Sequence, residues 1–212
     1  GRTEEATEEF RGAGPRAEAL NNVGATLAMS GHLSEAISWF SKARRADSTF
    51  DVATKNLAQA YSDYGAQQAR AGKHEEAAEL FEDALGLLPE FAVAHYNLGA
   101  SLVELREPRK ALRHYERAAS LDPGHEDVRY NLALVHLQLG QVDEAIENLE
   151  AALRQCEEPD VLVVLGNAWA EKNLAQRAVS CYNRALALDP DHRLARRNLD
   201  ISRGRHDSGV AL

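Results

Sequence analysis

Five copies of one short pattern recur along the chain, and they constrain its fold more than any other feature. Each copy places an alanine at the start of an apolar stretch with helical spacing, as in EEAAELFEDAL from Glu75 and DEAIENLEAAL from Asp143. Consecutive alanines are 41, 34, 34 and 33 residues apart: Ala36, Ala77, Ala111, Ala145 and Ala178. Such a period indicates a repeat protein, in which each copy forms one small structural element that must stack on its neighbours to bury a core.

Each repeat contains two helical patterns, with small residues where the two helices must approach each other. When each repeat is numbered from 1 to 34, place 8 holds glycine or alanine, and places 20 and 27 hold alanine. Place 24 holds a large residue in every repeat: Phe40, Phe81, Tyr115, Leu149 and Tyr182. Small facing residues let antiparallel helices pack closely, and the large residue then fills the space between neighbouring repeats.

A 34-residue repeat of two helices, closed by a turn such as LDPGH at 121–125, resembles the tetratricopeptide repeat (TPR) family. The resemblance covers residues 17–203 and implies an all-α fold, a right-handed superhelical solenoid of antiparallel helix pairs. We expect an acidic N-terminal segment at 1–16, a capping helix at 193–203 and a disordered tail at 204–212. The five repeats are expected at 17–50, 51–91, 92–125, 126–158 and 159–192.

The second repeat is seven residues too long, and the excess falls in its first helix. Reading forward from Phe50 and backward from Gly72 each gives a first helix in register. Seven residues are close to two helical turns, so an insertion of that length keeps the same face inward. Because no proline interrupts the segment, the pattern favours one long helix over 51–71, and a helix broken at Gly65 is the alternative.

Charge and cysteine content exclude several classes of function. A formal net charge of −9 disfavours nucleic acid and anionic membranes as partners. The apolar runs are too short for membrane insertion, and no secretory leader opens the sequence. The two cysteines, Cys156 and Cys181, are too few for a disulfide framework, and they favour a reduced, cytoplasmic compartment. Because residue 1 is glycine, an excised or processed piece of a longer protein is also expected.

The sequence contains no residue pattern typical of a catalytic or metal site. Eight histidines are present, but no pair has the spacing of a metal site on a helix. Neither cysteine has a histidine nearby in sequence that would activate it as a nucleophile. We therefore expect a protein that is not an enzyme, binds no metal and needs no cofactor.

In the TPR family the first helix of each repeat lines a concave groove, and the resemblance implies that places 2, 5, 6, 9, 12 and 13 point into it. Place 6 holds asparagine in most repeats and in the capping helix, with Val164 as the exception: Asn22, Asn56, Asn97, Asn131 and Asn198. An asparagine side chain has one acceptor and two donors in nearly the geometry of a peptide group, so a row of them can hold an extended backbone. This row resembles the groove of the repeat domain of O-linked N-acetylglucosamine transferases. The alternative is that these amides bond to their own or a neighbouring helix.

Other residue types accompany the asparagines in the expected groove: Asp63, Tyr96, Val103, Tyr130, Leu134, Leu137 and Asn167. Rings and aliphatic side chains beside amides can bury apolar side chains of a ligand and still pair with its backbone. Acidic residues such as Asp127 and Asp160 make this face negative, and the lysines by which chaperone-binding TPR proteins hold an acidic tail are missing. The expected partner segment is therefore neutral or basic, with apolar side chains.

These features together predict a non-catalytic scaffold that binds an extended or helical protein segment in its concave groove. Two alternatives stay open. One is a structural protein that assembles into a homo-oligomer, and the other is the recognition region of a larger enzyme.

Overall fold

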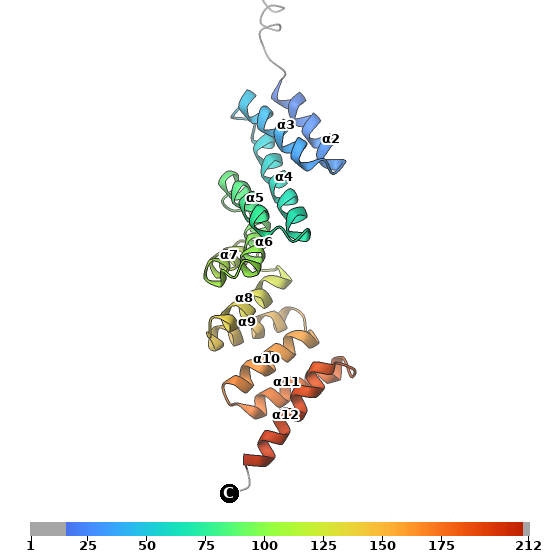
Figure 1. Cartoon of the computed structure of the whole chain (residues 1–212), viewed down its shortest axis with the longest axis vertical. Coiled ribbons are helices and arrows are strands. Elements are labelled where there is room, and N and C mark those ends of the chain that lie inside the picture. The colour runs from blue at the N-terminus through green and yellow to red at the C-terminus, as the bar shows by residue number, and fades with distance from the viewer. Residues whose placement is uncertain (1–15, 210–212) are drawn as a thin grey trace, which may run out of the picture. The chain divides into compact units, whose positions relative to one another are not determined.

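The computed structural model describes residues 16–209, and every regular element in that range is an α-helix (Figure 1). The helices are α2 (Ala17–Met29), α3 (Leu33–Ala46), α4 (Asp51–Arg70), α5 (His74–Leu87), α6 (Ala92–Glu104), α7 (Pro108–Leu121), α8 (Glu126–Gln138), α9 (Val142–Gln155), α10 (Pro159–Glu171), α11 (Ala175–Leu188) and α12 (Arg193–Gly209). Helices joined by a short turn pack along each other, namely α2 with α3, α4 with α5, α8 with α9 and α10 with α11. The expected all-α class of paired helices is confirmed.

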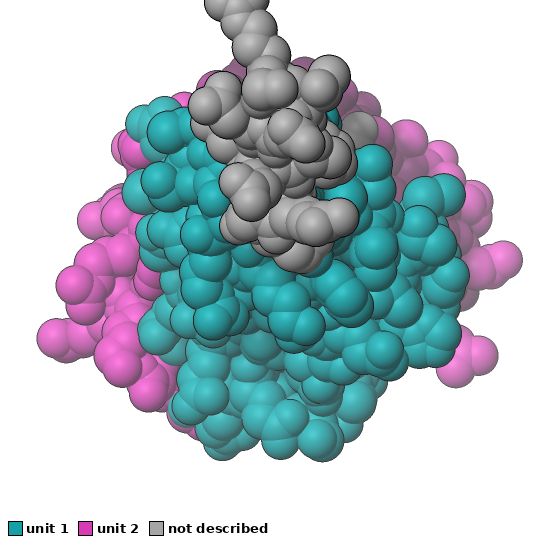
Figure 2. All heavy atoms as spheres, turned by 90° about the horizontal axis from the view of Figure 1, so that it is seen from above, with its two compact units in different colours: residues 1–105 teal, residues 106–212 magenta. Residues whose placement is uncertain are grey.

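The chain divides into two compact units, residues 1–105 and residues 106–212 (Figure 2). Within the first unit, α3 also packs on α4, and α5 packs on α6. Within the second unit, α7 packs on α8, α9 on α10 and α11 on α12. The division falls between α6 and α7, so the two helices of the third expected repeat belong to different units.

The turn inside each helix pair has the same backbone conformation at the same place of the repeat, place 15. Five residues at this place have positive φ angles, from 61° to 81°: Gly31, Gly72, Arg106, Gly140 and Asn173. After α2, the Gly31 amide donates to the carbonyl of Ala28 and the next amide donates to that of Leu27, which is a Schellman cap. Glycine adopts this backbone at little cost, whereas other residues lose about 1–2 kcal/mol. The cap ends the first helix and returns the chain along it.

Three glycines at place 8 pack against the large ring at place 24 of the same repeat: Gly24, Gly65 and Gly166. A Cβ atom at Gly65 would lie 2.8 Å from the Phe81 ring, and one at Gly166 would lie 2.4 Å from the Tyr182 ring. Real Cβ atoms essentially never make contacts under 3.0 Å, so a larger residue at these places would force the ring or the helix to move. The repeated glycine–ring pair is therefore a requirement of helix packing.

The first helix of the second repeat, α4, is a single helix of 20 residues, whereas α2, α6, α8 and α10 have 13 each. Its N-terminal half contributes Leu57 to an apolar cluster around Phe40 of α3. Its C-terminal half places Gly65 beneath Phe81 of α5. Gly65 therefore serves close packing rather than a hinge, and the inserted turns let one face of α4 contact two partners.

The last helix, α12, is longer than predicted, because it continues to Gly209 instead of ending at 203. The predicted disordered tail is thus wrong for residues 204–209, where glycine weakens a helix but no proline stops it. Ala195 and Leu199 of α12 are buried in an apolar cluster with residues of α10 and α11, as a capping helix requires. Of the predicted terminal segments, residues 1–15 and 210–212 lie outside the described residues.

Candidate peptide-binding surface

The predicted groove residues divide between the two units, and all of them lie on the first helix of a pair or on α12. The first unit carries Asn22 on α2, Asn56 and Asp63 on α4, and Tyr96, Asn97 and Val103 on α6. The second unit carries Tyr130, Asn131, Leu134 and Leu137 on α8, Asn167 on α10 and Asn198 on α12. Each unit therefore has its own candidate surface, which we call its first-helix face.

On the first-helix face of the first unit, an amide pair connects α4 to α2. Nδ2 of Asn56 donates to Oδ1 of Asn21 at 2.9 Å. Asn21, which is only 5% exposed, was not among the predicted residues. Asn56 thus bonds to a neighbouring helix, the alternative that the sequence left open. Its carbonyl oxygen and its second N–H remain available to a ligand.

The other predicted residues of the first unit are exposed or half-buried. Asn22 and Asp63 are exposed, and Oδ1 of Asp63 accepts a hydrogen bond from Nε2 of Gln59 at 2.8 Å. Tyr96, Asn97 and Val103 are half-buried along α6. Among residues 16–209 the Asn97 side chain has no hydrogen-bond partner, so the whole amide can pair with a bound backbone.

On the first-helix face of the second unit, one amide connects three helices. Oδ1 of Asn167 accepts hydrogen bonds from Nδ2 of Asn198 on α12 and from the hydroxyl of Tyr182 on α11, each at 2.8 Å. Both lone pairs of this oxygen are therefore used within the protein. Because Asn167 is exposed, its NH₂ group can still donate to a ligand.

Along α8, the predicted residues contribute both to the core and to the surface. Tyr130 and Leu137 pack against the apolar cluster that α8, α9 and α10 share. Leu134, one helical turn after Tyr130, is 37% exposed. Asn131 is half-buried next to Tyr130 in the sequence. The spacing of these residues places them along one side of the helix, with apolar area that a ligand can cover.

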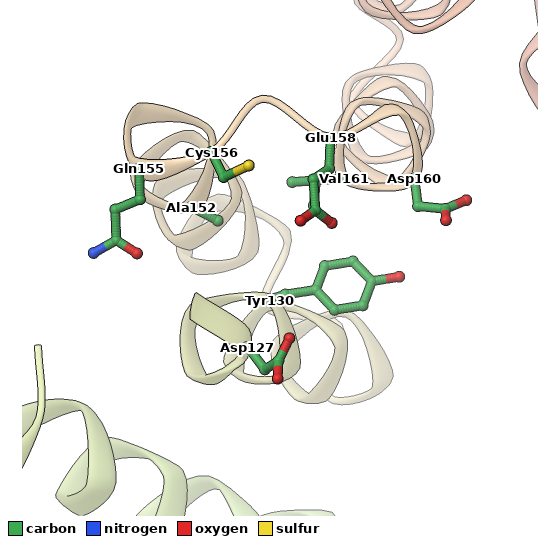
Figure 3. A pocket seen from close by; sticks show the side chains of 8 residues that line it. All are labelled: Asp127, Tyr130, Ala152, Gln155, Cys156, Glu158, Asp160 and Val161. Carbon is green, nitrogen blue, oxygen red and sulfur yellow. The ribbon is translucent and has the colours of Figure 1, made fainter. Parts of the chain in front are cut away.

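Tyr130 also lines a pocket of about 170 Å³ at the N-terminal ends of α8 and α10 (Figure 3). The pocket residues are Asp127, Tyr130, Ala152, Gln155, Cys156, Glu158, Asp160 and Val161. Figure 3 shows the Tyr130 ring extending below the α9–α10 connection, with Asp127 beside it and the side chains of Glu158 and Val161 pointing toward it. Three of the lining residues are acidic and none is basic, so the pocket is negative.

The surroundings of Tyr130 favour its neutral form and favour a bound cation. Burial raises the pKa of the Tyr130 hydroxyl above its ordinary value, and the negative charges of Asp160 and Glu158 raise it further. A carboxylate oxygen of Asp160 lies 3.0 Å from Nε2 of His192. Carboxylates and an aromatic face each attract an ammonium or guanidinium group, so together they form a suitable site for one.

The raised pKa of Tyr130 gives a prediction for stability at alkaline pH. In the unfolded chain the phenol loses its proton near its ordinary pKa of about 10, while the folded chain still holds it. The phenol therefore lowers the free energy of unfolding only above that pH, and Tyr130→Phe removes this loss. We expect the wild-type minus variant difference from chemical denaturation to fall as the pH rises through about 10. A difference that stays constant between about pH 8 and pH 11 would contradict the raised pKa.

Sequence reasoning missed several residues of these surfaces, among them Asn21, Cys156 and Glu158. The last two lie in the α9–α10 connection, where QCEEP replaces the LDPGH type of closing turn. This irregular closing turn was the feature of the sequence that could have indicated the pocket.

Among the described residues, no group of three histidine, cysteine or acidic side chains could hold a metal ion. In that same part of the chain, no helix combines the length and the apolar character needed to cross a membrane.

The chain is similar to known repeat proteins in both sequence and structure. A solved structure of YrrB, described as a TPR protein with an unusual peptide-binding site, is 26% identical with a TM-score of 0.66, and the match covers 92% of this chain and 95% of that chain. A solved structure of the MamA protein is 25% identical with a TM-score of 0.61, covering 81% and 90% of the two chains. The RNA polymerase-associated protein CTR9 of Saccharomyces cerevisiae is 36% identical over 66 residues. This match spans 29% of the present chain and only 6% of CTR9.

Models of the tetratricopeptide repeat match three consecutive segments, residues 15–90, 96–158 and 159–192. These segments include α2 to α11, whose glycine–ring pairs and capped turns follow the repeat. The chain belongs to the tetratricopeptide repeat family.

Proposed function

We propose that this chain is a non-catalytic binding module that holds an extended or helical segment of a partner protein on its first-helix faces. The observation that carries the proposal is the surface of α8 and α10, where an exposed leucine and an open amide lie near an acidic pocket with an aromatic wall. TPR proteins are typically interaction modules without catalytic activity. The solved structure of YrrB is described as having a peptide-binding site, which supports a peptide segment as the ligand of this chain.

The contacts that the second unit offers define the chemistry of the ligand. Leu134 and the Tyr130 ring can cover an apolar side chain, while the NH₂ of Asn167 donates to a backbone carbonyl. A lysine or arginine of the ligand can enter the negative pocket beside Tyr130. We therefore propose a neutral or basic segment with apolar side chains, as the sequence predicted. An acidic segment would be repelled by Asp127, Glu158 and Asp160.

The proposal is tested by selecting ligands from a random library of 12-residue peptides displayed on phage. We expect the selected peptides to combine leucine or aromatic residues with lysine or arginine. Replacing Asn97 and Asn131 together by alanine removes one amide from the first-helix face of each unit. Whichever face a peptide occupies, it loses a backbone hydrogen bond, and its binding should weaken about tenfold. Helical circular dichroism should stay unchanged. If the selected peptides bind the double variant as tightly as the wild type, the row of asparagines does not hold the peptide backbone.

A control variant and a chemical probe make this test specific. Asn148→Ala removes an amide on the second helix α9 that bonds to a backbone carbonyl of the same helix, so binding should stay unchanged.

Cys156 is exposed in the acidic pocket, whereas Cys181 is buried. A bound peptide should therefore slow the labelling of Cys156 by iodoacetamide. Binding that leaves this labelling rate unchanged would rule out the pocket as part of the site.

A further inference from the structure

A second hollow in the second unit is formed by α9, α10 and α11 and has a volume of about 420 Å³. We call it the arginine groove, because it is lined by three arginines and one acidic residue, together with apolar side chains: Arg154, Arg177, Arg184, Glu150, Leu153 and Trp169. Most of these residues lie on second helices, so the arginine groove is separate from the first-helix face. A concentration of arginines is unexpected in a chain with a net charge of −9.

Two of the three arginines have no ion-pair partner in the part of the chain that the structure describes. Nε of Arg184 donates to a carboxylate oxygen of Glu157 at 3.0 Å. The guanidinium of Arg177 instead lies over the Trp169 ring, 4.4 Å from its centroid. Within residues 16–209, no carboxylate lies within ion-pair distance of Arg154 or Arg177, although Glu150 lines the same groove. Each free guanidinium offers a planar fork of N–H donors that fits a carboxylate.

A similar groove in the first unit shows that the fold itself does not impose this charge. That groove, of about 460 Å³, is formed by α3, α4 and α5 and is lined by Arg44 and Arg45 on one side and by Glu82 and Asp83 on the other. Arg45 stands at the same place of its repeat as Arg154, whereas Asp83 stands at the place of Arg184. Two acidic residues thus balance two arginines in the first unit. The second unit has the same construction with an excess of positive charge.

We propose that the arginine groove binds an acidic segment of a partner protein, whose carboxylates accept hydrogen bonds from Arg154 and Arg177. The apolar side chains of Leu153 and Trp169 in the groove favour a segment that also carries an apolar residue. Nucleic acid is the less suitable anion, because the rest of the chain is strongly acidic and repels a polyanion. This surface lies outside the proposed function and selects the opposite charge. The module then holds one basic and one acidic segment at separate sites.

The test uses a fluorescein-labelled peptide, EELEEF, and fluorescence anisotropy with the full chain. We expect saturable binding that weakens with salt, because the contacts are ionic and close to solvent. Arg154→Gln with Arg177→Gln should weaken binding on the order of tenfold or more. The matched control, Arg44→Gln with Arg45→Gln, removes the same charge from the balanced groove and should change the affinity less than about twofold. The neutral peptide QQLQQF should not bind.

Three outcomes would overturn the proposal. Equal loss of affinity in both double variants would mean that only net charge matters. Equal binding of QQLQQF and EELEEF would remove the role of the carboxylates. A mass that rises with protein concentration in light scattering, and that the Arg154/Arg177 variant abolishes, would assign the groove to a second copy of the chain. All four arginines are exposed, so helical circular dichroism should be unchanged in both variants.

Discussion

Replacing Gly166 by alanine is expected to lower the free energy of unfolding by about 1–3 kcal/mol. The new Cβ atom would lie 2.4 Å from Cε1 of Tyr182, whose ring is 1% exposed. The ring cannot turn aside easily, because its hydroxyl donates a hydrogen bond to Asn167 at 2.8 Å. Alanine is the better helix former by up to about 1 kcal/mol, but moving two packed helices apart costs more.

Gly86 provides the matched control for this substitution, because it is also a helical glycine, on α5. A Cβ atom at Gly86 would have no neighbour within 4 Å. Gly86→Ala is therefore expected to raise the free energy of unfolding by about 0.5–1 kcal/mol, through the lower backbone entropy of the unfolded chain. Urea denaturation of both variants measures the two effects. If Gly166→Ala proved as stable as the wild type, Gly166 and the Tyr182 ring could not be in the close contact described.

The helix packing could be predicted from the sequence because each repeat solves the same local problem. A glycine and a ring sixteen places apart recur together, so their contact follows from periodicity alone. The place in the repeat determines the backbone conformation even where the residue type disfavours it. Arg106 adopts a φ of 62°, a region that arginine seldom enters, because it occupies the place where three other repeats have glycine.

The roles of the amides could not be predicted in the same way, because their partners stand at different places in different repeats. Asn56 and Asn198 both occupy place 6, yet Asn56 bonds to Asn21 at place 5 and Asn198 bonds to Asn167 at place 9. A side-chain amide pairs with whichever polar group a neighbouring helix presents. Periodicity therefore identified the row of asparagines but did not show which members already bond within the protein.

The arginine groove was missed for a related reason. Arginines on second helices look like ordinary solvated residues, and their charge matters only if no acidic residue lies opposite. That condition depends on a neighbouring repeat, which supplies Glu82 and Asp83 in one unit and Arg184 in the other. One signal was present in the sequence. Arg177 and Arg184 are seven residues apart, about two turns, and so share one face of α11.

Replacing Leu149 by alanine is expected to have the largest effect on stability, a loss of about 2–5 kcal/mol. Leu149 is 0% exposed and takes the place that rings occupy in the other repeats. Several of its neighbours in the α8–α9–α10 cluster are themselves alanines, including Ala133 and Ala145. Short side chains cannot move into the cavity that the substitution leaves, so we expect the loss to lie in the upper part of this range.

Leu134→Ala is the control on α8, where the leucine is 37% exposed and its loss should lower the free energy of unfolding by only about 1–2 kcal/mol. Urea denaturation compares the two variants, and equal losses would contradict the burial of Leu149. The same pair separates stability from binding. Leu134→Ala should weaken the peptides selected on the first-helix face, because it removes the apolar surface offered to them, and should leave the fold intact. Leu149→Ala should do the reverse at temperatures where the variant remains folded, since Leu149 has no surface to offer a ligand.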